Sequence, residues 1–155
     1  NISMETTYCR MEKVMPGTTV ASALQIPKTE MCYCLTRVRS VQGKPLVYTV
    51  TYLRDIVELP MDSQYYMESL YKYLSEVHEI RIVKGRDTLA AALPSPEVQK
   101  FLEIEAQMPV FKRIRQTFLP GEDFPELHNG GKDGLVSEYS VCYYPGNRYK
   151  YTVDL

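Results

Sequence analysis

Two long runs of strand-forming residues meet at one tight turn, and this hairpin constrains the fold more than any other stretch. Residues 31–41 and 46–53 flank the turn sequence Gln42-Gly43-Lys44-Pro45. In the second run, apolar side chains alternate with Val and Thr, at Leu46, Tyr48, Val50 and Tyr52. Because side chains alternate between the two faces of a strand, this pattern predicts a strand with one apolar face. The chain is therefore expected to contain an antiparallel sheet.

The other elements are predicted from turn residues, helix caps and the periodicity of apolar side chains along the chain. Strands are predicted over 6–14, over 80–93 with a bulge near Gly85, and over 109–119. Helices are predicted from Thr18 or Thr19 to about residue 24, over 62–77, and from the Ser95-Pro96-Glu97 cap to about residue 106. Residues 120–134 are rich in Gly, Pro, Asp and Asn and are read as a long loop. The order favours an α+β fold, with helices packed on a mostly antiparallel sheet.

The last eighteen residues, 138–155, are predicted to form two strands folded over Pro145-Gly146-Asn147. The period of two places Glu138, Ser140, Cys142 and Tyr144 on one face of the first strand. A single carboxylate among Ser, Cys and Tyr side chains suggests that Glu138 has a specific binding partner. Either it binds a ligand, or it forms a salt bridge to Arg113 or Arg115.

Composition excludes several classes of function. A chain of 155 residues is the size of a single domain, and a net charge of −1 gives no electrostatic footprint for nucleic acid. No apolar run is long enough to span a bilayer. The four cysteines contain no Cys-x-x-Cys pair, and Cys32 and Cys34 with two histidines make a poor zinc ligand set. We expect buried, reduced cysteines in a cytoplasmic protein, with no metal and no cofactor.

The C-terminal motif carries a family resemblance. Glu138, then Tyr144 six residues later, then Gly146-Asn147-Arg148-Tyr149 resemble the end of the UTRA domain, with Asn147 where the family usually has Asp. UTRA domains form the effector-sensing half of GntR-type bacterial transcription regulators of the HutC subfamily. The resemblance covers nearly the whole chain from about Tyr8. It implies a six-stranded antiparallel sheet similar to chorismate lyase, in a single domain over 1–155.

An arginine pair before the turn is the first candidate for ligand binding. Arg37 and Arg39 lie two apart, so both guanidinium groups project from one strand face. Such a pair matches a phosphate or carboxylate, although two exposed arginines on a sheet face would give the same spacing. UTRA domains commonly carry Arg-x-Arg before a Gly-x-Pro turn, matched here by Gly43 and Pro45. The resemblance implies that this pair helps to hold an effector phosphate.

Further site residues come from the same resemblance. Ser69-Leu70-Tyr71 resembles the Ser-Leu/Ile-Tyr of the family at the start of its central helix, where Ser69 would donate to the same anion. The residues alone also allow Ser69 as a mid-helix polar residue and Tyr71 as core packing. Glu138 and Tyr144 would close the other end of the pocket.

Two departures from the family pattern bear on the ligand. Thr49 stands where the family often has Glu, which favours a neutral or phosphorylated ligand over a cationic one. The lid that covers the effector in some relatives has no clear counterpart before Tyr8, so His128 and Asn129 of the long loop could supply contacts instead.

The favoured hypothesis is a sensor of a small-molecule effector, such as a sugar phosphate, acting within a homodimer and not as an enzyme. DNA would be bound only through an N-terminal winged-helix domain, which we expect to be missing from this chain. Its first residue, Asn1, is equally consistent with a truncated parent and with an expression remnant. Two alternatives stay open. One is an enzyme resembling chorismate lyase, against which no nucleophile–base pair or phosphate-cradling glycine loop is found. The other is a dimerisation module without a ligand.

Overall fold

The computed structural model describes residues 3–127 and 131–155. Its centre is one six-stranded antiparallel sheet with the strand order β1-β2-β3-β6-β5-β4. The strands are β1 (Met4–Val14), β2 (Cys32–Val41), β3 (Lys44–Arg54), β4 (Lys84–Ala92), β5 (Val110–Leu119) and β6 (Leu135–Pro145). The predicted α+β class and the six-stranded antiparallel sheet are confirmed, and the fold is consistent with a chorismate-lyase-like architecture.

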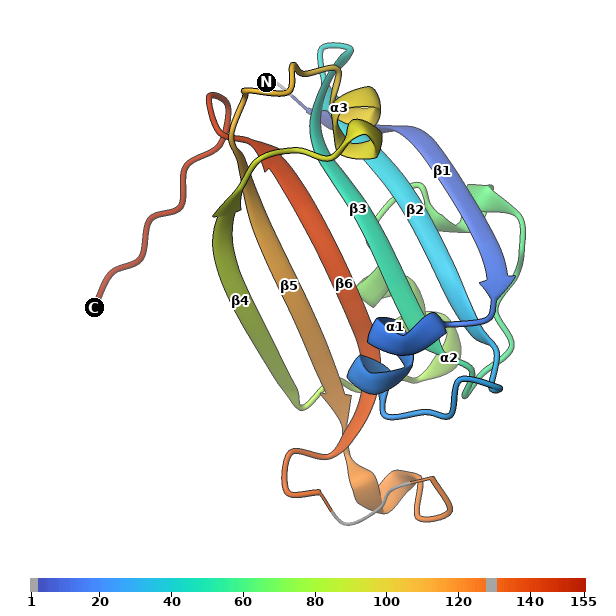
Figure 1. Cartoon of the computed structure of the whole chain (residues 1–155). Helices are drawn as coiled ribbons and strands as arrows, with labels where there is room; N and C mark the ends of the chain where they lie inside the picture. The colour runs from blue at the N-terminus through green and yellow to red at the C-terminus, as the bar shows by residue number, and fades with distance from the viewer. Residues whose placement is uncertain (1–2, 128–130) are drawn as a thin grey trace.

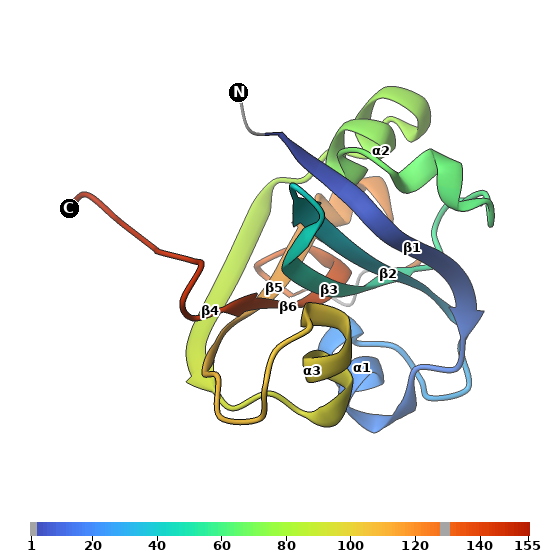
Figure 2. The same ribbon diagram turned by 90° about the horizontal axis from the view of Figure 1, so that it is seen from above.

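Helices cover both faces of the sheet (Figures 1 and 2). Helices α1 (Gly17–Leu24) and α3 (Pro96–Leu102) lie on one face, and α2 (Leu70–His78) lies on the other, as the view from above shows. Two short 3-10 turns, η1 (Ser63–Tyr66) and η2 (Gly121–Asp123), complete the described elements.

Each helix packs on its own part of the core. The α1 cluster includes Val20, Leu24 and Cys32, whereas the α3 cluster includes Val98 and Tyr48. A third cluster lies beneath η1 and α2 and is formed by Met11, Tyr33, Leu35, Leu53, Leu59, Tyr66, Leu70 and Leu74. The odd-numbered residues of β2 therefore face α2, which places Arg37 and Arg39 on that side.

The predicted boundaries fail at two helices. The segment predicted as one helix over 62–77 is interrupted, because Ser69 has extended backbone angles and its Oγ accepts the Lys72 amide at 3.3 Å as the cap of α2. The helix predicted to reach residue 106 stops at Leu102, where Glu103 adopts a left-handed conformation (φ 55°). The Ser95 cap is confirmed, but α1 is preceded by Pro16 without a side-chain cap, and not by Thr18 or Thr19.

The strand predicted for the C-terminal end of the chain is wrong. Residues 149–155 form no strand and extend away from the sheet (Figure 1). The reason is topological, because β6 is already paired on both edges, with β3 and with β5. A strand folded back from Pro145 would find no free edge beside β6. The bulge predicted near Gly85 is also wrong, since β4 pairs with β5 in unbroken register from Lys84 to Ala92.

Candidate functional site

A cavity of about 300 Å³ lies between the α2-side face of the sheet and the start of α2. The sheet supplies its floor in rows of cross-strand neighbours. In one row Arg37, Thr49, Cys142 and Arg113 follow one another across β2, β3, β6 and β5. The next row places Thr51, Ser140 and Arg115 side by side. All seven residues singled out from the sequence line this cavity, namely Arg37, Arg39, Thr49, Ser69, Tyr71, Glu138 and Tyr144.

The two arginines of β2 are held differently. Arg37 donates from Nη1 to the backbone oxygens of Tyr66 (3.1 Å) and Glu68 (2.8 Å), so it ties β2 to the connection before α2. Burial lowers the pKa of Arg37 from its usual value. Arg39 has a buried Nε with no hydrogen-bond acceptor among the described residues. Of this pair, Arg39 is therefore the guanidinium left open to a ligand.

Ser69 and Tyr71 bring the start of α2 to the cavity. Ser69 is the helix cap and not a mid-helix residue, so the orphan amide groups of the first turn lie beside the cavity. A helix N-terminus favours negative charge. Tyr71 turns its hydroxyl toward β6, where it donates to both carboxylate oxygens of Glu138, at 2.9 and 3.2 Å.

Glu138 is buried, and hydroxyl groups surround its carboxylate. Besides Tyr71, it accepts from Thr117 Oγ1 at 3.0 Å and from the Ser140 hydroxyl. The salt bridge to Arg113 or Arg115 considered from the sequence is not found among the described residues. Burial and the charge of Glu138 raise the pKa of Tyr71, which keeps this phenol a neutral donor. These hydroxyl groups hold the carboxylate in place, and Glu138 is one of the residues that line the cavity.

Arg113 and Arg115 of β5 are site residues that the sequence reasoning missed, since they were considered only as partners of Glu138. Both line the cavity. Arg115 makes a two-pronged ion pair with Asp87 of β4, at 2.7 and 2.8 Å. Arg113 donates only to the weak acceptor Cys142 Sγ (3.4 Å), and its Nε is buried without an acceptor among the described residues. The signal was available, because Arg113-Ile114-Arg115 repeats the spacing of Arg37 and Arg39.

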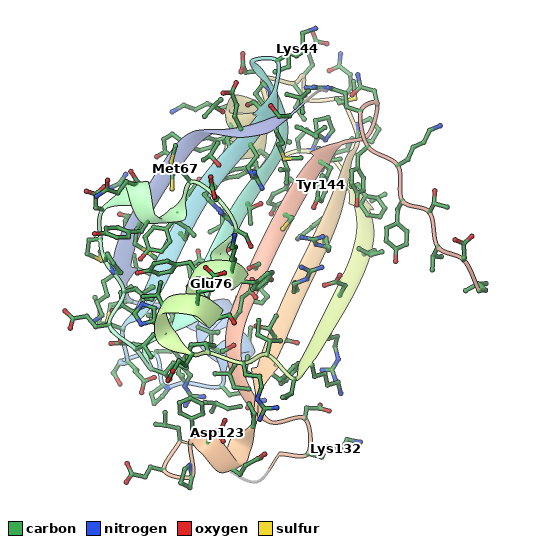
Figure 3. All side chains as sticks on the ribbon, turned by 180° about the vertical axis from the view of Figure 1, so that it is seen from behind. Lys44, Met67, Glu76, Asp123, Lys132 and Tyr144 are labelled. Atoms are coloured by element: carbon green, nitrogen blue, oxygen red, sulfur yellow. The ribbon has the colours of Figure 1, made fainter. Side chains whose placement is uncertain are left out.

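Tyr144 and Thr49 complete the floor. Tyr144 lies near the end of β6 (Figure 3) and stacks on Tyr149 with ring centroids 4.0 Å apart. Burial raises the pKa of Tyr144 to about 12. Thr49 lies between Arg37 and Cys142 in the sheet and brings no charge to the floor. Met4, at the start of β1, also lines the cavity and was not foreseen.

The cavity is cationic and contains a single acidic side chain. Among the described residues that line it, four are arginines and Glu138 alone is acidic. Guanidinium groups beside hydroxyls and a helix N-terminus are groups that can bind a phosphate or a carboxylate. The described residues of the 120–134 loop do not line the cavity, and His128 and Asn129 lie outside the described residues.

The cysteines form no disulfide among the described residues. Cys32, Cys34 and Cys142 are buried and Cys9 is half-buried, which confirms the prediction of buried free thiols for three of the four. In the described part of the chain, no group of three or more His, Cys, Asp or Glu residues is arranged to hold a metal ion. None of the helices in that same part of the chain is long and apolar enough to cross a membrane.

The Asp87–Arg115 pair gives a pH-dependent prediction. Arg115 holds the pKa of Asp87 below its usual value, so the pair stabilises the fold above the unfolded pKa of about 3.9. This stabilisation is lost as the pH falls through the lower folded pKa. We expect Asp87→Asn to lower the free energy of unfolding at pH 7 by less than about 1 kcal/mol, because the pair is partly solvated.

Urea unfolding of the wild type and of Asp87→Asn at a series of pH values measures this difference. The difference should vanish at the acid end of the series. The matched control is Asp154→Asn, which removes the same charge from the tail and should change stability at no pH. A difference for Asp87→Asn that grows on acidification would contradict the assignment.

Comparison with known proteins agrees with this architecture. The family model of the UTRA domain matches residues 1–150. The chain belongs to the UTRA domain family. UTRA domains are the effector-binding domains of GntR-family transcription regulators, so the resemblance seen in Glu138, Tyr144 and the residues after them is confirmed.

Individual relatives are distant in sequence and close in structure. The UTRA chain is 23% identical over 130 residues to the mannosyl-D-glycerate transport/metabolism system repressor MngR of Escherichia coli, covering 84% of this chain and 49% of MngR. PhnF from Mycobacterium smegmatis superposes with a TM-score of 0.79 at 19% identity, over 99% of this chain and 63% of PhnF.

A GntR-family transcriptional regulator from Enterococcus faecalis gives a TM-score of 0.76 at 18% identity, over 99% of this chain and 100% of the other. At these identities, the two structures show the fold alone. The UTRA chain spans about half the length of MngR and less than two thirds of PhnF.

Proposed function

We propose that this UTRA domain binds a phosphorylated sugar or a similar anionic metabolite in the cavity above β2, β3, β6 and β5. It would act as the effector-sensing part of a cytoplasmic, dimeric regulator whose DNA contacts are made by another domain. The observation that carries the proposal is the imbalance of charge, because four guanidinium groups and one carboxylate line a single cavity.

The phosphate is assigned to the corner formed by Arg39, Arg37 and Ser69. Arg39 offers an open guanidinium, and Arg37 adds its charge while it holds the connection before α2 by two backbone oxygens. The capped start of α2 adds amide groups of positive polarity. These contributions come from β2 and from the start of α2, and all of them line the same cavity.

The sugar is assigned to the side of the cavity lined by Glu138, Thr49 and Tyr144. The Glu138 carboxylate is oriented by three hydroxyl donors, so it is suited to accept hydrogen bonds from ligand hydroxyls. A volume of about 300 Å³ lies at the small end of the range of ligand pockets, which suits one sugar ring with a phosphate. The relative MngR is named for a sugar derivative, which also supports a ligand of this class.

Regulation by such a ligand requires that it bind two arrangements of the dimer with different affinity. Coupling free energies of about 1–3 kcal/mol are typical of such control. The connection held by Arg37 is a suitable element, because β1 also contacts it through the hydrogen bond from Thr6 Oγ1 to Met67 O at 2.7 Å. A ligand at this corner would touch the segment that links β1, β2 and α2.

A thermal-shift series tests the proposal. Sugar 6-phosphates should raise the melting temperature, while the parent sugars should not. At a ligand concentration one hundred times its Kd, the stabilisation should be about 2.7 kcal/mol. For a domain of this size, that corresponds to a rise of roughly 5–11 °C. Equal shifts for sugars and sugar phosphates would refute the phosphate assignment, and no shift from any phosphorylated compound would refute the proposal.

A further inference from the structure

Two arginine pairs face each other across the cavity. Arg37 and Arg39 belong to β2, and Arg113 and Arg115 belong to β5. Thr49 of β3 and Cys142 of β6 lie between Arg37 and Arg113 in one row of the sheet. With neighbouring strands about 4.8 Å apart, three strand steps separate the two pairs by about 14 Å at the backbone. The arginines therefore form two opposite walls and not one cluster.

Each wall contains one tethered guanidinium and one open guanidinium. On the β2 wall, Arg37 is bonded to the backbone oxygens before α2, and Arg39 is open. On the β5 wall, Arg115 is paired with Asp87. Arg113 is open in the sense that it has no anionic partner: it donates to the weak acceptor Cys142 Sγ, lies over the Tyr144 ring, and has a buried Nε without an acceptor in the described part of the chain. The tethered arginines, Arg37 and Arg115, fix the position of each wall. The open arginines, Arg39 and Arg113, are the ones available to a ligand in the cavity.

The carboxylate of the cavity neutralises neither open group. The printed partners of Glu138 are the hydroxyls of Tyr71, Thr117 and Ser140, and the described residues include no ion pair to it. A single phosphate in the corner of Arg39 would leave Arg113 in a filled cavity with only the weak acceptor Cys142 Sγ and with its Nε unpaired. A buried donor without a partner is unfavourable, and a second charged acceptor at the β5 wall removes that penalty.

We propose that the effector carries two separate acid groups, a phosphate bound at the Arg37–Arg39 wall and a carboxylate bound by Arg113 at the other wall. The ligand class is then a phosphorylated sugar acid. A carboxylate fits the second position because one open, planar guanidinium can donate two parallel hydrogen bonds to it. This inference rests on the proposed function, and it makes Arg113 the residue that distinguishes sugar acids from simple sugar phosphates.

The test is calorimetric titration of the chain with glucose 6-phosphate, gluconate and 6-phosphogluconate, with inorganic phosphate and fructose 1,6-bisphosphate alongside. We expect 6-phosphogluconate to bind about tenfold or more tighter than glucose 6-phosphate, the ratio that one additional charge-assisted pair provides. In Arg113→Gln this advantage should disappear, while the Kd for glucose 6-phosphate should change little. Arg113→Lys keeps the charge without the planar fork and should retain part of the advantage.

The matched control is Lys112→Gln, which removes a positive charge from the adjacent residue of β5, whose amine lies over the Tyr143 ring. This variant should preserve the preference for 6-phosphogluconate. Circular dichroism and the binding of glucose 6-phosphate show that each variant is folded.

Four results would overturn the inference. Equal Kd values for 6-phosphogluconate and glucose 6-phosphate, or an equal loss for both in Arg113→Gln, would refute a carboxylate site at Arg113 and leave the proposed function intact. Tighter binding of fructose 1,6-bisphosphate than of 6-phosphogluconate would assign the second wall to a phosphate and refute the carboxylate. If no probe binds, inorganic phosphate included, the proposed function fails together with this inference.

Discussion

Arg39→Gln is expected to lose most of the stabilisation by sugar phosphates while the ligand-free domain stays as stable as the wild type or becomes more stable. A hydrogen bond to a charged group contributes about 1.5–3 kcal/mol, which corresponds to a loss of about 10- to 140-fold in affinity. In the free domain, Arg39 places a buried Nε without an acceptor among the described residues, close enough to Arg37 for the two charges to repel. Removing it should raise the free energy of unfolding by up to about 1 kcal/mol.

Urea unfolding without ligand, and calorimetric titration with a sugar phosphate, measure the two effects separately. The matched control is Arg10→Gln, which removes a guanidinium from the surface ion pair with Glu12. The Arg10 side chain is 63% exposed. This control should affect neither measurement by more than about 0.5 kcal/mol. If Arg39→Gln destabilised the free domain as strongly as it weakened binding, Arg39 would be a structural residue and not a ligand-binding one.

Gly134→Ala is expected to cause the largest loss of stability among these variants. Gly134 has φ +101° at the start of β6, and a Cβ placed there would lie 2.3 Å from the backbone oxygen of Leu119 at the end of β5. Neither atom can move without separating β5 from β6. The positive φ costs an Ala about 1–3 kcal/mol before the overlap is considered. We therefore expect a loss of about 3 kcal/mol or more, which lowers the melting temperature by roughly 6–12 °C.

Differential scanning calorimetry of Gly134→Ala beside Gly17→Ala separates the two contributions. Gly17 has a similar positive φ of +72°, but a Cβ there meets no described atom within 4 Å. The control should therefore lose only the conformational part, about 1–2 kcal/mol. If both variants lost the same free energy of unfolding, the close approach of Leu119 to Gly134 would not limit the residue at position 134.

Local patterns predicted the faces of β2 and β6 correctly. The period of two placed Glu138, Ser140, Cys142 and Tyr144 together, and the structure has all four on the cavity floor. The same rule put Arg37 and Arg39 on one side of β2. Which strands lie side by side depends on pairing between distant segments, and the sequence contains no local signal for the register that sets Cys142 between Thr49 and Arg113. The spacing of Arg113 and Arg115 shows that they share a strand face, but only the pairing of β5 with β6 shows that this face borders the cavity.

Errors occurred where tertiary context outweighed composition. Tyr149, Tyr151, Val153 and Leu155 alternate like a strand, yet the edge they would need is occupied. Tyr149 and Tyr151 pack instead near the start of β5, where Phe111 contacts both rings. The apolar periodicity of 62–77 was also genuine, but η1 ends at Tyr66 and Ser69 caps α2 as a separate helix.

The position of β6 has a consequence for how the molecule is made. Strand β6 alone joins the group β1-β2-β3 to the pair β5-β4, and it is the last strand in the chain. A nascent polypeptide emerging from the ribosome can therefore form two partial sheets, but it cannot join them until translation has passed Pro145. Glu138 arrives on that final strand, so the cavity acquires its carboxylate in the same event that completes the sheet. A polypeptide truncated before this strand would contain two separate partial sheets, each with an exposed edge strand prone to aggregation.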